Sequence, residues 1–232
     1  MKRSILTLLL ALLTVLALCA CGGTAEEPAE TAEAEETAET AEEESGPVSK
    51  LVAVYDSMDP ETGVHMNYDV YIVSMDTTSQ YDVHGKGGTY YARQSMEKYE
   101  GYDSIKFIQD GMFYTLKVRD NTGISMKGPS TDNAMITDGV YSAIQQCRSR
   151  DDFTVGEATL NGETYEAELF PAIASAPIAY TFCFDEAGNL VGLIYEANED
   201  LGTPEMDYTI RVIDDQVDES LFDISGYTIT EQ

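Results

Sequence analysis

Two cysteines, Cys19 and Cys21, end an apolar run at the start of the chain, in the stretch LTVLALCACGG. Cysteines spaced in this way could form a redox pair, bind a metal ion or accept a lipid. The run follows the basic start Met-Lys-Arg and is too short to span a bilayer comfortably, as is typical of a secretory signal. A zinc site is not expected there, because no second cysteine pair stands nearby to complete it.

The residues around Cys21 fit the lipid attachment site of bacterial lipoproteins. Leu18 lies three residues before Cys21, and the small Ala20 lies directly before it. Cys19 fits badly, because the bulky Leu18 would then occupy the cleavage position. We therefore predict a signal peptide at residues 1–20, a lipid on Cys21, and attachment to the extracytoplasmic face of the cell membrane. A plain secretory signal with incidental cysteines and an uncleaved anchor are the alternatives.

The tract that follows is acidic and of low complexity. Residues 22–46 repeat Thr-Ala-Glu and hold ten glutamates without a basic residue. The tract has no aromatic or large aliphatic side chain, so it cannot bury a core and is expected to be disordered. Residues 21–46 therefore form a predicted tether, and residues 47–232 form a single predicted domain. With a net charge of −29, the protein should repel nucleic acid and anionic lipid headgroups, so the lipid must provide the membrane attachment.

The predicted domain carries no recognisable motif for chemistry. His65 and His84 are the only histidines, and neither lies in a metalloprotease motif or beside a Cys or Asp at ligand spacing. We predict that both are surface residues of strands or turns. The segment GKGG at residues 85–88 lacks the spacing of a phosphate-binding loop and is expected to be a turn. The sequence therefore predicts no enzyme, no cofactor and no metal site, and it does not identify a protein partner.

Two further cysteines, Cys147 and Cys183, lie in the predicted domain. One belongs to a predicted helix end and the other to a predicted strand. Outside the cytoplasm they could form a disulfide. Pairing depends on a distance in the folded protein that the sequence does not give. A disulfide and two buried free thiols therefore both stay open.

Hydrophobic periodicity predicts two helices and several strands. A helix is expected at 48–58, with a strand as the alternative because the run is rich in Val and Tyr. A second helix is expected from a cap at Ser130 or Thr131 to Cys147. Alternation with a period of two predicts the strands, and the clearest are 66–72, 105–107, 112–118, 124–126, 153–160, 163–170, 178–184, 190–195 and 208–212. The pairs Asp110-Gly111 and Asn161-Gly162 are strong hairpin signals.

This order of elements predicts an α+β fold with a curved antiparallel meander sheet. Hairpin turns dominate the connections, and each strand has one apolar and one polar face, so one face of the sheet needs a cover. Two helices are too few to cover both faces. They are enough to fill the concave face, and we expect the N-terminal helix and the central helix to lie there.

Several stretches of the sequence resemble those of a known group of proteins. The lipid attachment site, the acidic spacer and the leading helix are followed by FTVGEATLNGETYEAELF, YTFCFDEAGNLVGLIYE and the closing VDESLFDISGYTIT. In this order they resemble small surface lipoproteins of Gram-positive bacteria in the LolA/LolB-like, LppX/LprG-like group, over residues 48–230. The resemblance implies an open half-barrel that often holds an acyl chain between its sheet and its helices. No ligand-binding motif of the group is matched residue by residue.

A cavity between the strands and the two helices could therefore hold a lipid or another apolar ligand. Burial of each methylene group of such a ligand would contribute about 0.8 kcal/mol. The candidate lining residues are Val70, Ile72, Tyr114, Leu116, Ile136, Val140, Ile144, Tyr180 and Phe182. The alternative is a surface interaction or structural lipoprotein, in which these side chains fill the core and leave no room for a small molecule.

Overall fold

The computed structural model describes residues 48–96, 98–99, 102–128 and 134–232. The predicted lipid attachment site and tether lie outside these residues. The helices are α1 (Leu51–Asp56) and α2 (Gly139–Cys147), with the short 3-10 helices η1 (Val73–Met75), η2 (Ala134–Thr137), η3 (Glu199–Leu201) and η4 (Glu219–Phe222). No helix in the described ranges is long and apolar enough to cross a membrane.

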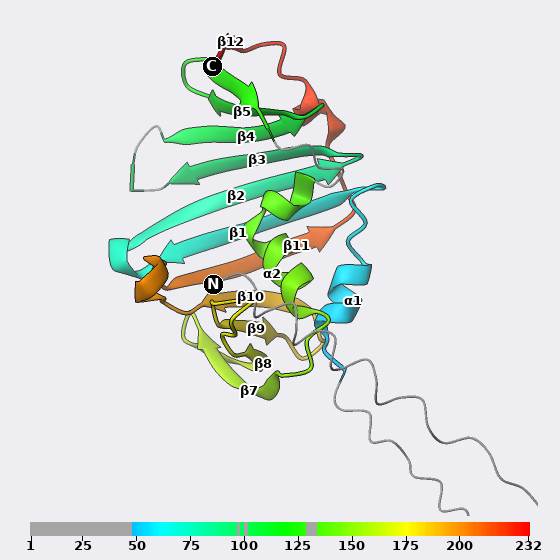
Figure 1. Cartoon of the computed structure of the whole chain (residues 1–232), viewed down its shortest axis with the longest axis vertical. Coiled ribbons are helices and arrows are strands. Elements are labelled where there is room, and N and C mark those ends of the chain that lie inside the picture. Colours follow the sequence, from blue (N-terminus) through cyan, green and yellow to red (C-terminus); the bar gives the residue numbers. More distant parts are fainter. Residues whose placement is uncertain (1–47, 97, 100–101, 129–133) are drawn as a thin grey trace, which may run out of the picture. The chain divides into compact units, whose positions relative to one another are not determined.

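The strands form one sheet (Figure 1). Along the chain they are β1 (Val64–Ile72), β2 (Thr77–Lys86), β3 (Thr89–Met96), β4 (Asp103–Gln109), β5 (Met112–Lys117), β6 (Thr122–Lys127), β7 (Thr154–Leu160), β8 (Glu163–Phe170), β9 (Tyr180–Phe184), β10 (Leu190–Tyr195), β11 (Met206–Asp214) and β12 (Thr228–Glu231). Their order in the 12-stranded sheet is β12-β6-β5-β4-β3-β2-β1-β11-β10-β9-β8-β7. An open, mostly antiparallel sheet with few helices was predicted, and the structure confirms it.

The sheet consists of two meanders rather than one. Strands β1 to β6 follow one another in the first, and β7 to β11 in the second. The antiparallel pairing of β1 with β11 joins the two meanders, while β12 adds to β6 in the parallel direction. In this long-range pairing, the first strand of the first meander lies beside the last strand of the second.

Glycine-containing turns set the register of the hairpins. Asp110 and Gly111 have φ angles of 52° and 72°, and Asn161 and Gly162 have 53° and 83°. Positive φ at both central residues defines a turn whose twist matches that of the two flanking strands. Both turns were predicted. The β2–β3 hairpin was not predicted, because its strands lack a clear alternation of apolar and polar residues. Its turn is formed by Gly87 and Gly88, whereas Gly85 and Lys86 of the GKGG segment belong to β2, so the expected turn is confirmed only for the second half of the segment.

The central helix begins later than the sequence predicts. The chain forms η2, then leaves the helical conformation at Asp138, which caps α2. The Asp138 Oδ1 atom accepts hydrogen bonds from the amides of Val140, at 2.9 Å, and Tyr141, at 3.0 Å. These amides have no partner within the helix, so the side chain satisfies two otherwise free donors. The expected cap positions Ser130 and Thr131 lie outside the described residues.

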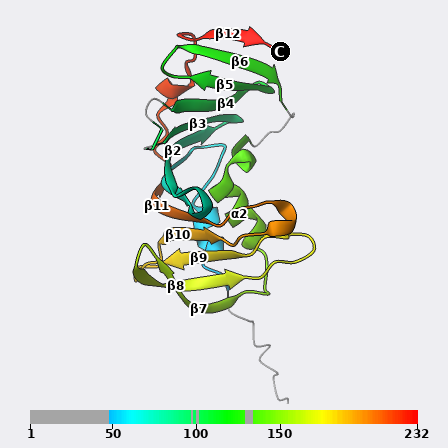
Figure 2. The same cartoon turned by 90° about the vertical axis from the view of Figure 1, so that its left-hand side faces the viewer.

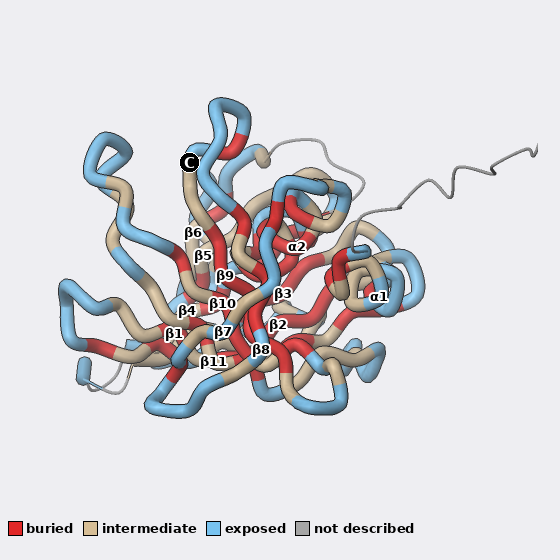
Figure 3. The backbone as a smooth tube through the Cα atoms, turned by 90° about the horizontal axis from the view of Figure 1, so that it is seen from below, coloured by how far each residue is buried: buried red, intermediate tan, exposed pale blue. Residues whose placement is uncertain are grey.

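Both faces of the sheet are covered in the first meander. The helices and one face of the strands share the main core cluster, which includes Leu51, Tyr141 and Phe182, and Figure 3 shows buried stretches gathered where the strands approach α2. A second cluster around Phe107 and Leu116 packs against apolar residues 221–229 of the C-terminal segment. Figure 2 shows this segment and α2 on opposite sides of the sheet. The prediction that only one face of the sheet needs a cover is therefore wrong at β4 and β5.

A buried carboxylate fastens the start of α1 to the second meander. Glu168, on β8, is 3% exposed. Its oxygens accept hydrogen bonds from Ser49 Oγ at 2.6 Å and from the Lys50 amide at 2.7 Å. Because both bonds bridge distant parts of the chain, Glu168 holds the entry to the helix in place.

Substitution of Glu168 by alanine is expected to lower the free energy of unfolding by about 1–3 kcal/mol, because Ser49 and the Lys50 amide would lose their buried acceptor. Urea unfolding followed by circular dichroism measures this change. Glu166→Ala is the matched control, since the Glu166 carboxylate forms a half-exposed ion pair with Lys50 and should cost less than about 1 kcal/mol. Equal losses in the two variants would contradict the fastening role.

Candidate ligand-binding site

A cavity of about 140 Å³ lies between the sheet and the start of α2. Strands β1 to β4 and β11 contribute its wall, and residues 137–139 close it from the helix side. Its lining residues are Tyr68, Val70, Ile72, Ser79, Tyr81, Tyr90, Ala92, Gln94, Lys106, Thr137, Asp138, Gly139, Met206 and Tyr208. Aromatic and aliphatic side chains dominate this wall, and a few polar groups converge on it, as in small-molecule sites.

A buried carboxylate lies at the helix side of the cavity. Asp138 is 2% exposed, and its Oδ2 atom accepts a hydrogen bond of 2.6 Å from the Tyr68 hydroxyl. Burial raises the pKa of Asp138 above its ordinary value, against the lowering effect of its hydrogen bonds with Tyr68, Tyr141 and Val140. Burial also raises the pKa of Tyr68, and the nearby charge of Asp138 raises it further by a smaller amount. The Asp138 carboxylate accepts hydrogen bonds from both the helix and the sheet, so it positions the wall.

Tyrosine rings form much of the wall and pack on one another. The ring of Tyr68 stacks on that of Tyr81 with centroids 5.1 Å apart and contacts that of Tyr208 at 5.8 Å. Tyr195 packs behind Tyr208, and its hydroxyl donates a 2.9 Å hydrogen bond to the Gly139 carbonyl oxygen. Rings held by neighbours on two sides lose little further freedom when a ligand binds, so this wall is preorganised.

The rim of the cavity is polar and carries a positive charge. Lys106, from β4, is exposed and is the one cationic residue among the lining residues that the structure describes. Beside it, the Gln94 amide donates a 3.3 Å hydrogen bond to Ser79 Oγ. In a protein of net charge −29, a lysine at the mouth of a cavity is a local attraction for an anion. The cavity therefore combines an apolar wall with a cationic mouth.

The structure divides the nine predicted lining residues among four environments. Val70 and Ile72 line the cavity. Val140, Ile144, Tyr180 and Phe182 lie in the main core cluster, where their side chains are packed against neighbours and do not line this cavity. The remaining three are elsewhere: Tyr114 and Leu116 belong to the second cluster on the opposite face, and Ile136 is 43% exposed.

These misplacements have a physical cause. Alternation along β5 separates two faces but does not say which face meets the helices. The more apolar face, with Tyr114 and Leu116, meets the C-terminal segment instead. The residues that were missed carry weak but readable signals. Asp138-Gly139 before a helical pattern is a cap signal, and tyrosines on a half-buried strand present one apolar face and one hydroxyl.

A second, larger hollow lies between α1 and strands β10 and β11, with a volume of about 540 Å³. Its charged lining residues already have partners. Arg211 pairs with Asp69 and Asn67, and Asp185 accepts hydrogen bonds within its own turn from Ala187 and Asn189. Since these groups are engaged within the fold, the tyrosine-lined cavity is the better candidate for a small ligand.

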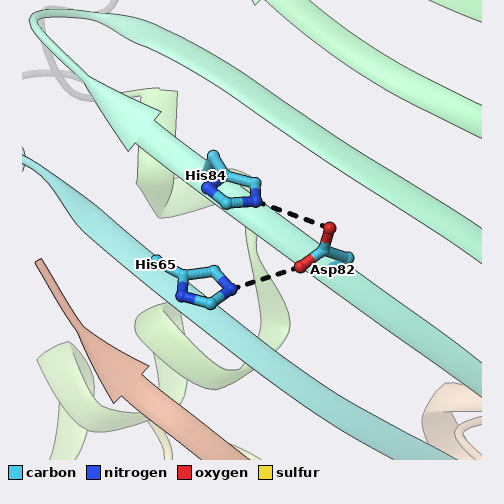
Figure 4. A group of neighbouring side chains, drawn as sticks. All are labelled: His65, Asp82 and His84. Atoms are coloured by element: carbon cyan, nitrogen blue, oxygen red, sulfur yellow. Dashed lines mark hydrogen bonds and ion pairs between the residues drawn. The ribbon is translucent and has the colours of Figure 1, made fainter. Parts of the chain in front are cut away.

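The two histidines meet on the face of the sheet opposite the helices (Figure 4). His65 on β1 lies directly across from His84 on β2, and their rings stack with centroids 4.5 Å apart. Asp82 lies between them, 3.2 Å from His65 Nε2 and 3.4 Å from His84 Nε2. Hydrogen bonding to His84, with smaller contributions from the His84 charge, Asn67 and His65, lowers the pKa of Asp82 to about 2, against the opposing effect of burial. The prediction that both histidines are surface residues is therefore wrong for His84, which is 4% exposed.

The two cysteines of the domain are free thiols and both are buried. Cys147 ends α2 and belongs to the main core cluster. On β9, Phe182 and Phe184 also face that cluster, so Cys183 between them points to the other face of the sheet. Of the two alternatives left open by the sequence, the structure has the free thiols. Burial raises the pKa of each to about 11.

Comparison with known proteins finds similarity in fold. No family model matches the sequence, and no curated protein matches it. Among solved structures, an uncharacterized conserved protein from Thermus thermophilus is similar at 10% identity, with a TM-score of 0.47 over 79% of this chain and 97% of that chain. The lipoprotein LppX from Mycobacterium tuberculosis is similar at 14% identity, with a TM-score of 0.38 over 73% and 97%.

A LolA superfamily protein from Nitrosomonas europaea is similar at 10% identity, with a TM-score of 0.36 over 75% of this chain and 96% of that chain. The lipoprotein LppX and this LolA superfamily protein are thus among the solved structures to which the chain is similar. At these identities the likeness concerns the fold alone.

Proposed function

We propose that this chain is a membrane-tethered, non-enzymatic binding protein whose sheet–helix cavity holds the apolar end of a small anionic amphiphile. The observation that carries this proposal is the cavity itself, with its preorganised tyrosine wall and Lys106 at its mouth. The sheet would act as a half-barrel, with α1 and α2 against its concave face. The apolar end would lie against Val70, Ala92 and Tyr208, and the anionic group would face Lys106.

The volume of the cavity limits the size of the bound group. An apolar cavity of about 150 Å³ holds one benzene molecule, and this cavity has about 140 Å³. A single ring or a short stretch of methylene groups therefore fits, whereas a whole acyl chain of a membrane lipid requires α2 to move. The surrounding core supports the smaller ligand, because its side chains are packed and buried.

The tether is the second part of the proposal. A lipid on Cys21 would hold the protein at the extracytoplasmic face of the membrane, and residues 22–46 would let the domain stand away from it. A flexible coil of that length spans on the order of 25–30 Å. The domain would then meet amphiphiles close to the membrane surface without touching the anionic headgroups.

A series of straight-chain fatty acids tests the size of the cavity. We expect the affinity of the protein to rise about fourfold for each added methylene group from butanoate onward, because each contributes about 0.8 kcal/mol. The affinity should then stay constant once the cavity is full. Isothermal titration calorimetry with butanoate to hexadecanoate gives the curve. A rise that continues to hexadecanoate would contradict the small volume of the cavity, and an absence of binding throughout would contradict the proposed function.

Paired variants locate the binding. Ala92→Phe places a ring in the cavity and should abolish binding, whereas Val155→Phe on the exposed side of β7, 54% exposed in the wild type, should leave it unchanged. Lys106→Gln should lower the affinity for fatty acids about two- to fivefold but leave the affinity for the matching alcohols unchanged. Substitution of the exposed Lys117 by glutamine is the control and should change neither affinity. Binding that survives Ala92→Phe would place the ligand elsewhere, as in a surface interaction protein with a filled core.

A further inference from the structure

The pairing of β1 with β2 gathers a histidine, an aspartate and a second histidine on one face of the sheet. His65 and His84 are direct partners in the strand register, and Asp82 precedes His84 by two residues, so all three share a face. The neighbours Met66 and Val83 point the other way, into the main core cluster. The backbone thus fixes the starting points of all three side chains.

The spacing of the donor atoms suits a small metal ion. One ligand atom from each of the three residues lies within 4.8 Å of the other two. A tetrahedral zinc ion with bonds of about 2.0–2.2 Å keeps its ligand atoms about 3.3–3.5 Å apart. His65 Nε2 lies 3.2 Å from Asp82 Oδ1, and His84 Nε2 lies 3.4 Å from Asp82 Oδ2. Because the two contacts use different oxygens, one edge of the coordination polyhedron is already close to its required length when Asp82 binds the ion through a single oxygen.

His65 lies between two carboxylates, and a neutral imidazole cannot donate to both of them. Its Nδ1 atom lies 3.0 Å from Asp214 Oδ1, and its Nε2 atom lies 3.2 Å from Asp82 Oδ1. A neutral imidazole has one N–H group and can donate to only one of these carboxylates. The other contact then brings a nitrogen lone pair against an anionic oxygen, unless a second proton or a metal ion lies there. Within the described part of the chain, the ion pairs of both carboxylates involve only the histidines.

We propose that His65, Asp82 and His84 form a binding site for a divalent transition metal ion, and that Zn²⁺ is the ion it takes. Two imidazoles and one carboxylate suit this class of ion, and three protein ligands leave one position open. Asp214 is a positioning residue, because it accepts the Nδ1 proton of His65 and so leaves Nε2 free for the metal. Metal-bound histidines generally have such a partner.

Metal binding would alter the contacts around His84. The two rings now stack with an angle of 9° between their planes, so they must rotate apart to point both Nε2 atoms at one ion. Coordination through His84 Nε2 puts the ring proton on Nδ1, which now lies 3.4 Å from the Asp218 amide. That amide would lose its acceptor. The turn that leads into η4 should therefore shift when the metal binds.

Histidine-selective nuclear magnetic resonance offers a direct test, because the chain has two histidines and both belong to the site. After treatment of the full chain with a chelator, one equivalent of Zn²⁺ should shift the Nε2 signals of both rings and the amide signal of Asp218. Titration with Co²⁺ should give visible absorption bands that saturate at one ion per chain. Unchanged ring signals, or absorption without saturation at one equivalent, would overturn the proposal.

Single substitutions distinguish metal binding at this site from general binding of metal ions to the acidic surface. His65→Gln and Asp82→Asn should lower the affinity for Co²⁺ at least 100-fold, and Asp214→Asn should lower it about 10–100-fold. Asp120→Asn, at an exposed turn residue, should leave it unchanged. Circular dichroism checks that each variant is folded, and the wild-type resonance test stands without them. Equal affinities in all four variants and the wild type would contradict the site.

Discussion

Replacement of Asp138 by alanine is expected to lower the free energy of unfolding by about 2–5 kcal/mol. The carboxylate caps α2 through the Val140 and Tyr141 amides and accepts the Tyr68 hydroxyl. Loss of a helix cap costs about 1–2 kcal/mol, and a buried donor left without an acceptor adds about 1–3 kcal/mol. The expected loss is the largest among the single substitutions considered for stability. Urea unfolding of the full chain at neutral pH measures it.

Asp138→Asn is the matched variant and should behave differently. Asparagine caps helices as well as aspartate does, and it carries no charge to bury. We expect its free energy of unfolding at neutral pH to be at or above that of the wild type. A loss as large as that of Asp138→Ala would show that the charge, and not the acceptor geometry, holds the helix.

The wild type and Asp138→Asn should also differ in how their free energy of unfolding depends on pH. Burial raises the pKa of Asp138 in the folded state above the ordinary value of 3.8, so within the window between the two values the folded state binds more protons than the unfolded state. Stability from this group therefore falls as pH rises through that window. The wild type should lose stability relative to Asp138→Asn from pH 4 upward. A difference of the opposite sign would contradict the raised pKa.

Substitution of Cys21 by alanine is expected to release almost all of the protein from the membrane fraction into the medium. The predicted signal offers no other attachment, and the acidic chain is repelled by anionic headgroups. Cell fractionation followed by immunoblotting measures the distribution. Cys19→Ala is the control and should leave the protein on the membrane, because Cys19 is not the predicted lipid attachment site.

Two other distributions would contradict this account. If Cys21→Ala stays on the membrane, the apolar run is an uncleaved anchor or another segment holds the chain. If Cys19→Ala is released instead, the lipid is on the other cysteine. Mass spectrometry of the N-terminal peptide would identify the modified residue in either case.

Local signals of the sequence predicted much of the fold. The turns at Asp110-Gly111 and Asn161-Gly162 need positive φ, which these residues adopt easily, so the hairpins followed from composition. The pairing of β1 with β11 could not be predicted in this way, because it joins strands far apart in the chain. For β2 and β3 the alternation is blurred, since Ser79 and His84 are buried polar residues.

The candidate site was harder to predict than the fold, because it depends on which face of each strand meets the helices. Val70 and Ile72 lie beside the cavity, although their role in binding stays a prediction. Leu116 does not, because it lies on the opposite face, which the C-terminal segment covers with Phe222 and its neighbours. The histidine cluster depends on the register that sets His65 opposite His84, and such a register is a property of the whole hairpin.

Native mass spectrometry of the Cys21→Ala chain, purified from bacterial cells without detergent, tests the central claim most directly. The account predicts one bound molecule per chain that is released on denaturation, carries a carboxylate or phosphate group and is absent from the Ala92→Phe variant. Extraction with organic solvent then identifies it. A bare mass, together with no binding of added fatty acids from butanoate to hexadecanoate, would contradict a ligand-binding role for the cavity.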